Sequence, residues 1–272
     1  MLERVIRKGT DAAELLACMR EFGICVVPGY YASSFVDTIR EACVARIDEP
    51  GDMNYPDGSY KRFDAYQGSA AAANERIYHI DCFSDEAARF RHDPILNTVG
   101  SEYYGDPHSV HLCLYERHRP HPVPVRGFHV DTFETSTYKV MLYLSDVEEK
   151  DGPTSYLIGT HTDDELRRMK ENVWGPAVSP GDPSGTKHPT NFTDEELGDR
   201  LQRHVKVVGP RGTIVLFDTF GVHKGMPPMA GGERHVLVNY YRKGADLPRS
   251  NFGFDVKADH QRYAVDYKKY KA

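Results

Sequence analysis

The chain has 272 residues, of which 40% are hydrophobic and 27% are charged, as in an ordinary globular protein. Its net charge is −6, and Lys and Arg are spread along the chain without a basic cluster, so we expect no nucleic-acid partner. No apolar run approaches the roughly 18 residues that a membrane helix requires, so we expect no membrane partner either.

The five cysteines are widely spaced and include no Cys-x-x-Cys pair, which favours reduced thiols over a disulfide framework. The first residues, MLERVIRKGTDAAELL, lack the apolar core of a secretory signal. Both features predict a cytoplasmic location, and the sequence indicates no particular oligomeric state.

The N-terminal part is predicted to be helical. Residues 11–22 carry apolar side chains at helical spacing after a possible Asp11 cap. A short strand is predicted over residues 24–27, and a second helix over residues 34–47 with Ser33 or Ser34 as its cap.

Two long segments are rich in turn-forming residues. Residues 50–76 combine Gly, Pro, Asp and Tyr, and residues 172–200 combine Gly, Pro, Asp and Thr. We interpret the first as a long loop or a broken strand and the second as a loop. Both are expected to border the entrance to a site and to carry specificity, with Tyr60, Arg62 and Tyr66 as candidates.

From residue 108 the pattern is that of strands separated by Gly, Pro and Asp. Strands are predicted at 109–116, 137–147, 154–158, 203–208, 213–218 and 234–242. One helix interrupts them at about 163–171, with Thr162 or Asp163 as its cap.

This order predicts a single α+β, mainly β domain over residues 1–272. Its helical part (about 1–50) would pack on one sheet of a double-stranded β-helix, or jelly-roll, core (about 108–242). The lid-like loops would be residues of about 50–76 and 172–200.

A candidate metal site begins at His129-Val130-Asp131, just before a predicted strand. These two side chains could point at one spot, and His223, at the end of a later apolar strand, would complete a facial triad of the kind that binds iron(II) with three positions open. Arg234 follows eleven residues later, far enough for the chain to return on a neighbouring strand. Its guanidinium would hold a dicarboxylate in a two-pronged grip.

The predicted strand after this motif has two different faces. Tyr138, Val140, Leu142 and Leu144 alternate with Lys139, Met141 and Tyr143. The second face is interpreted as the lining of a cavity, with solvent exposure as the alternative, and Lys139 becomes a second candidate for binding the dicarboxylate.

A second His-x-Asp motif, His79-Ile80-Asp81, competes with the first. No strand of comparable length follows it, and we interpret His79 as an ordinary buried or surface residue. His161 is expected to serve the fold.

Four stretches of the sequence resemble the phytanoyl-CoA dioxygenase family of iron(II) and 2-oxoglutarate-dependent oxygenases. They are FHVD (128–131), YLSDVEEKDGP (143–153) leading to LIGTH (157–161), GTIVLFDTFGVHKG (212–225) and Arg234. The resemblance implies iron(II) as the metal, with 2-oxoglutarate and O2 as cosubstrates. It also implies His129, Asp131 and His223 as metal ligands and Arg234 as the 2-oxoglutarate ligand. Two positions depart from the family pattern: Gly225 replaces a small hydroxyl residue, and Met141 replaces an aromatic one.

The resemblance implies oxidation, in the first instance hydroxylation, of a small-molecule metabolite or secondary-metabolite scaffold, with release of succinate and CO2. Asp131 argues against halogenation, whereas desaturation, epoxidation and cyclisation use the same triad. Two other classes stay open: a cupin-like metal enzyme that does not use 2-oxoglutarate, such as an isomerase or an O2-only dioxygenase, and a non-catalytic jelly-roll binding protein.

Overall fold

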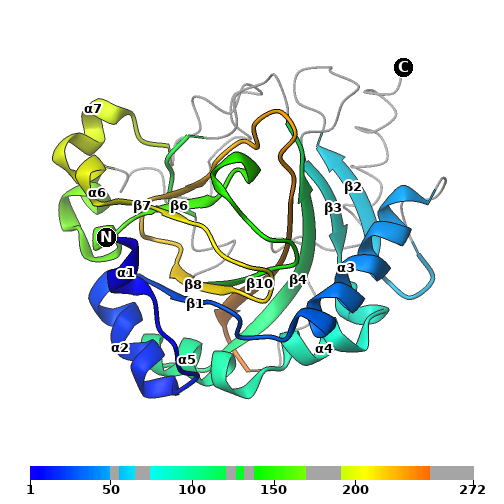
Figure 1. Cartoon of the computed structure of the whole chain (residues 1–272). Helices are drawn as coiled ribbons and strands as arrows, with labels where there is room; N and C mark the ends of the chain where they lie inside the picture. Colours follow the sequence, from blue (N-terminus) through cyan, green and yellow to red (C-terminus); the bar gives the residue numbers. More distant parts are fainter. Residues whose placement is uncertain (50–54, 65–73, 121–126, 132–137, 170–190, 246–272) are drawn as a thin grey trace.

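The computed structural model describes residues 1–49, 55–64, 74–120, 127–131, 138–169 and 191–245. Two antiparallel sheets face each other (Figure 1): a seven-stranded sheet in the order β1-β8-β5-β10-β4-β3-β2 and a three-stranded sheet in the order β7-β6-β9. The strands are β1 (Ile24–Val27), β2 (Tyr60–Asp64), β3 (Asn74–Tyr78), β4 (His108–His118), β5 (Tyr138–Tyr143), β6 (Thr154–Leu157), β7 (His204–Val207), β8 (Ile214–Asp218), β9 (His223–Gly225) and β10 (Arg234–Lys243). The predicted jelly-roll class is confirmed.

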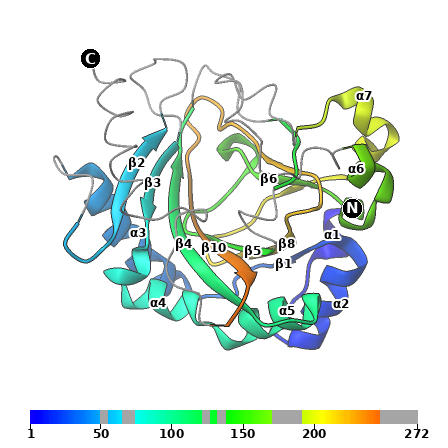
Figure 2. The same ribbon diagram turned by 180° about the vertical axis from the view of Figure 1, so that it is seen from behind.

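Most helices lie along the outside of the large sheet, while α6 and α7 lie beside the small one (Figures 1 and 2). The helices are α1 (Leu2–Val5), α2 (Ala12–Phe22), α3 (Ser33–Asp48), α4 (Asp85–Arg91), α5 (Pro94–Tyr104), α6 (Asp164–Met169) and α7 (Asp194–Leu197). In the described ranges, none has the length and apolar character of a membrane span. All five cysteines are free.

The first residues of the helices can be compared with the capping residues predicted from the sequence. The carboxylate of Asp11 accepts hydrogen bonds from the first-turn amides of α2, as expected. Asp163 does the same for α6, so Asp163 caps that helix. The prediction for α3 was wrong: its cap position is Ala32, without a side-chain hydrogen bond, and Ser33 and Ser34 lie inside the first turn.

Helices α4 and α5 were not predicted from the sequence, although both carry start signals. Ser84 caps α4, and Asp93 caps α5 directly before Pro94, a residue that suits the first turn of a helix. Their buried faces pack on the large sheet, where Asn239 of β10 donates a hydrogen bond to the Phe90 carbonyl oxygen (3.0 Å).

The first turn-rich segment contains regular structure. Residues 60–64 form β2, which pairs with β3 at the edge of the large sheet, and Tyr60 stacks on Tyr78 with ring centroids 4.4 Å apart. Of the two interpretations of residues 50–76, a long loop or a broken strand, the described part agrees with the strand, because it holds β2 and the start of β3. Tyr66 and the Arg62 side chain lie outside the described residues, as do residues 170–190 of the second segment.

The two faces of β5 meet different surroundings. On the helix side, Tyr138 packs so closely on α5 that a Cβ at Gly100 would lie 3.0 Å from its ring. On the other side, the Tyr143 hydroxyl donates to the carbonyl oxygen of Val207 in the small sheet (2.7 Å), and Thr154 donates to the Met141 sulfur (3.3 Å). The face that holds Lys139, Met141 and Tyr143 therefore lines the interior between the sheets, not the solvent.

Candidate metal centre

The backbone brings the two predicted histidines together. His129 and His223 exchange two backbone hydrogen bonds of 2.9 Å each, and the Asp131 amide donates to the carbonyl oxygen of Thr219 (2.9 Å). The segment that carries the His-x-Asp motif is thus held alongside the start of β9. Its outer side is also covered, because the Phe192 amide donates to the carbonyl oxygen of Phe128 (2.8 Å).

Each imidazole is oriented by a carbonyl oxygen two residues earlier. The Nδ1 atom of His129 lies 2.8 Å from the Gly127 oxygen, and that of His223 lies 2.9 Å from the Gly221 oxygen. Because a carbonyl only accepts, Nδ1 carries the proton in both rings and Nε2 keeps its lone pair for a metal. Gly221 is required here, since a Cβ would lie 1.7 Å from the Tyr156 hydroxyl oxygen.

Three ligand atoms converge at this place. The Nε2 atoms of His129 and His223 each lie 3.8 Å from a different oxygen of Asp131. One ligand atom from each residue can be chosen so that all three lie within 4.8 Å of one another, a grouping found at this one place in the described part of the chain. Two neutral imidazoles and one carboxylate match the donor set of the facial triad that holds iron(II).

Arg234 reaches across the interior from the large sheet. We expected its strand, β10, to be a neighbour of β9 in one sheet. This expectation was wrong, because β10 belongs to the large sheet and β9 to the small one. The side chain is nevertheless directed there: Nη1 donates to the Gly152 oxygen, and a Cβ at Gly225 would lie 3.3 Å from Nη2. The DGP turn therefore helps to hold the arginine.

The guanidinium of Arg234 has unused hydrogen-bonding capacity. The residue is 2% exposed, yet its Nε atom has no hydrogen-bond partner, and within the described residues no carboxylate forms an ion pair with it. Burial lowers the pKa of Arg234, while Tyr143, Glu116 and Asp151 act in the opposite direction. A buried cation that is not in direct contact with a carboxylate favours binding of an anion from solution.

Lys139 does not lie beside Arg234. It pairs with Tyr240 across the sheet, and Arg234 begins the same strand six residues earlier, a separation of about 20 Å at roughly 3.4 Å per residue. The Lys139 ammonium instead donates to Asp131 Oδ2 (2.5 Å). The expectation that Lys139 shares a carboxylate with Arg234 is therefore corrected to a contact with Asp131, a candidate metal ligand.

The second His-x-Asp motif is used by the fold. Asp81 forms a buried ion pair with Arg91 (3.1 Å), whose second terminal nitrogen donates to the Val110 oxygen (2.7 Å). His79 is buried and adopts the left-handed conformation (φ 58°) before a short 3-10 helix. His161 is also buried, with Nε2 3.3 Å from the Arg20 carbonyl oxygen.

A charged cluster on the interior face was missed by sequence reasoning. Glu116 of β4 contacts Arg76 of β3 (2.6 Å) and His118 (3.2 Å), and His118 is the cross-strand partner of Arg234. Burial raises the pKa of Glu116, but Arg76 and His118 outweigh it and hold that pKa well below its usual range. Alternation along β4 places Glu116 and His118 on one face, and this was the available signal.

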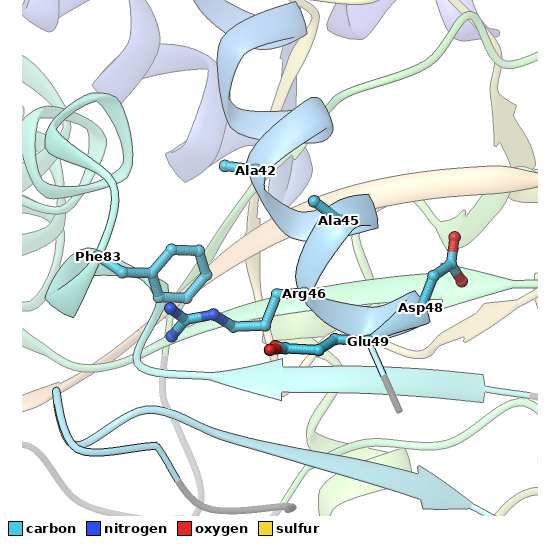
Figure 3. Close-up of a pocket in the computed structure, with 6 residues that line it drawn as sticks. All are labelled: Ala42, Ala45, Arg46, Asp48, Glu49 and Phe83. Atoms are coloured by element: carbon cyan, nitrogen blue, oxygen red, sulfur yellow. The ribbon is translucent and has the colours of Figure 1, made fainter. Parts of the chain in front are cut away.

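A surface pocket lies away from the metal centre, along the last turns of α3 (Figure 3). Its lining residues are Ala42, Ala45, Arg46, Asp48, Glu49 and Phe83. The Arg46 guanidinium lies 4.2 Å from the Tyr55 ring centroid and 3.8 Å from that of Phe83, and it forms an ion pair with Asp57 (2.6 Å). These contacts serve the packing of α3, so the pocket is not part of the candidate site.

The fold is shared with many proteins of known structure, among them the three described next. EctD from S. alaskensis, solved with 2-oxoglutarate and 5-hydroxyectoine, is 17% identical with a TM-score of 0.64, over 93% of this chain and 88% of the other. The epimerase SnoN, solved with Fe3+, alpha ketoglutarate and nogalamycin RO, is 15% identical with a TM-score of 0.62, over 90% of both chains. HygX from Streptomyces hygroscopicus, solved with nickel, 2-oxoglutarate and hygromycin B, is 17% identical with a TM-score of 0.58, over 88% and 89%.

The sequence itself gives the family. No protein of curated function matches the chain. The model of the phytanoyl-CoA dioxygenase family, however, matches residues 19–236, a range that includes the three candidate ligands and Arg234 and spans well over half of the chain. The chain therefore belongs to the phytanoyl-CoA dioxygenase family and is an iron(II) and 2-oxoglutarate-dependent oxygenase.

Proposed function

We propose that this oxygenase hydroxylates a small-molecule metabolite or secondary-metabolite scaffold, with His129, Asp131 and His223 as the iron ligands. The convergence of these three side chains, with both Nε2 atoms made available by the carbonyl contacts of Nδ1, carries the proposal. Three protein ligands leave three positions on an octahedral ion, two for a chelating 2-oxo acid and one for O2.

Arg234 is proposed to bind the distal carboxylate of 2-oxoglutarate. The buried guanidinium has an unsatisfied Nε and no carboxylate partner among the described residues, so a carboxylate from the cosubstrate would complete its contacts. Gly225 beside it leaves the space that a side chain would fill. This arrangement favours a dicarboxylate cosubstrate over a cupin-like reaction that needs none.

The overall reaction balances as 2-oxoglutarate, O2 and R–H giving succinate, CO2 and R–OH. One oxygen atom of O2 enters the carboxylate of succinate and the other enters the substrate. Bound iron would supply the redox chemistry. The chain supplies three fixed ligands, one cationic anchor for the cosubstrate, and an interior between two sheets that limits water around the reacting atoms.

The substrate class rests on the interior surface. Arg76, Glu116 and His118 make part of that surface charged, whereas Tyr240 and Met141 make another part apolar and nearly buried. Such a mixed lining suits a compact molecule with both polar and apolar parts. The structures of SnoN, HygX and EctD each contain a small molecule besides 2-oxoglutarate, which supports a substrate of this kind.

The test is a turnover assay with Fe(II), 2-oxoglutarate and O2 over a panel of small metabolites, measuring succinate and a product heavier by one oxygen atom. We expect succinate formation to depend strictly on 2-oxoglutarate and to rise when the true substrate is present. Turnover without 2-oxoglutarate would support the cupin-like alternative, and failure of the protein to bind Fe(II) would support the non-catalytic one. A product that has two hydrogen atoms fewer than the substrate would indicate desaturation in place of hydroxylation.

A further inference from the structure

The DGP turn, residues 148–153, contacts both the backbone next to Arg234 and the head of its side chain. The amide of Glu233, the residue directly before Arg234, donates to Asp151 Oδ1 (3.2 Å). The Nη1 atom of Arg234 donates to the carbonyl oxygen of Gly152, the neighbour of Asp151. One turn therefore holds both the start of β10 and the guanidinium that this strand carries.

Asp151 is also the residue that closes the turn. Its Oδ2 accepts a hydrogen bond from the Glu148 amide (2.9 Å), and the Glu148 side chain accepts one from the Asp151 amide. This reciprocal arrangement is a capping box. Asp151 is buried, both of its oxygens are engaged by backbone amides, and within the described residues it forms no ion pair with Arg234. The carboxylate thus holds the arginine through the backbone and does not occupy the guanidinium.

The DGP turn packs against the chain that follows β9. Gly152 has a φ of 71°, and a Cβ at this position would lie within 2.7 Å of three backbone atoms in residues 226–228. The Met229 amide donates to the carbonyl oxygen of Lys150 (2.7 Å). Because β9 begins with a candidate metal ligand, these contacts fix the position of the guanidinium relative to the metal centre.

A guanidinium with a fixed position affects some 2-oxo acids and not others. Under the proposed role of Arg234, a 2-oxo dicarboxylate has a second carboxylate for the guanidinium, and a guanidinium already in place binds it at a lower ordering cost. A 2-oxo monocarboxylate has no such group. Positioning of Arg234 therefore increases the affinity for dicarboxylates alone.

We propose that Asp151 is a positioning residue for Arg234, and that it thereby makes the site select 2-oxo dicarboxylates over 2-oxo monocarboxylates. This inference rests on the proposed role of Arg234. The charge of Asp151 acts in the opposite direction, because a buried negative charge near the arginine repels an incoming carboxylate. Positioning and charge therefore predict changes of opposite sign when Asp151 is neutralised.

The experiment compares Asp151→Asn with wild type. Asn has nearly the same shape, but an NH2 group replaces one of the two oxygens, so one backbone amide loses its acceptor. The Co(II)-loaded proteins are titrated with 2-oxoglutarate and, separately, with 2-oxobutanoate, and calorimetry gives the Kd of each acid. We expect the Kd of 2-oxoglutarate to rise about fivefold, within the range for one lost hydrogen bond, and the Kd of 2-oxobutanoate to stay within about twofold.

The two titrations separate positioning from other roles of Asp151. An unchanged Kd of 2-oxoglutarate would overturn the proposal, and so would a lower Kd, because Asp151 would then act through its charge alone. An equal rise for both acids would also overturn it, since that result means a general structural role. Asp93→Asn is the matched control: Asp93 accepts hydrogen bonds from two backbone amides at the start of α5 (3.0 and 3.1 Å), and neither Kd should change.

Arg234→Met separates a failure of this inference from a failure of the proposed function. It should reduce the preference for 2-oxoglutarate over 2-oxobutanoate by at least about tenfold, as expected for lost hydrogen bonds to a charged group. Adding Asp151→Asn should then cause no further change in this preference. A wild-type preference in Arg234→Met would contradict the proposed role of Arg234. Loss of the preference in Arg234→Met but not in Asp151→Asn would overturn the positioning role alone.

Glu148→Ala keeps the comparison decisive if Asp151→Asn does not fold. The Glu148 side chain is 69% exposed, so its removal should cost little stability. The substitution removes the hydrogen bond to the Asp151 amide and leaves the charge of Asp151 in place. We expect the Kd of 2-oxoglutarate to rise about threefold and that of 2-oxobutanoate to stay the same. No change for either acid, or an equal change for both, would overturn the proposal.

Discussion

Two copies of the same three-residue motif lie in this chain and serve different purposes. In His79-Ile80-Asp81, the carboxylate pairs with the buried Arg91, and that arginine is further satisfied by the Val110 oxygen. In His129-Val130-Asp131, the carboxylate faces two imidazoles, and the buried arginine of that region, Arg234, has no carboxylate partner among the described residues. Both carboxylates are paired within the fold, Asp81 with Arg91 and Asp131 with Lys139, so the difference between the regions lies in Arg234, which no described carboxylate pairs with and which can therefore receive one from a ligand.

The largest expected effect is the loss of the third ligand. His223→Ala should weaken Fe(II) or Co(II) binding by at least about 100-fold, because direct ligands matter more than the outer partners whose loss costs 10- to 100-fold. Metal titration by absorption measures it, and turnover should disappear with it. His79→Asn is the matched control: Asn tolerates the left-handed conformation of that position, so metal binding should match wild type. If His223→Ala bound metal as tightly as wild type, the assignment of a metal site to the motif at His129, and not to the motif at His79, would be contradicted.

The next effect concerns stability in the other region. Asp81→Asn leaves the Arg91 charge buried without its partner, which should lower the free energy of unfolding by about 3 kcal/mol, the lower end of the range for breaking a buried pair. Urea denaturation measures this loss. Metal affinity of the folded variant should be unchanged. A metal-binding defect in Asp81→Asn with normal stability would show that the first motif belongs to the site after all.

The smallest of the three effects compares the two buried arginines. Arg234→Lys keeps the charge but loses the planar fork, and we expect the KM for 2-oxoglutarate to rise about tenfold, equivalent to one strong hydrogen bond of about 1.4 kcal/mol. Steady-state titration of 2-oxoglutarate measures this change. Arg91→Lys should lower stability and leave that KM unchanged. Equal KM values in wild type and Arg234→Lys would remove the assignment of Arg234 to the cosubstrate.

Much of the local structure and the choice of the candidate metal triad followed from sequence alone. The Asp11 cap of α2, the strand around residues 138–143 and its two faces depend on neighbours within a few positions, so the pattern of side chains contains the information. The triad was predictable for a different reason. The motif at His129 and the strand-end position of His223 match a family pattern, and the structure brings both to one point.

Tertiary structure decided how residues of similar chemistry were distributed. Lys139 was expected to bind the same carboxylate as Arg234, but the register of β5 on β10 separates them by six residues and places the ammonium on Asp131. Strand pairing also decides the partner of Glu116, because the register of β3 on β4 places Arg76 directly opposite it. Hydrogen-bonded caps and alternating faces are properties of adjacent residues, whereas the choice of a charged partner depends on which distant strands meet and in which register. For that reason the sequence alone was sufficient to name His129, Asp131 and His223 as candidate iron ligands, and only the folded chain shows what surrounds them.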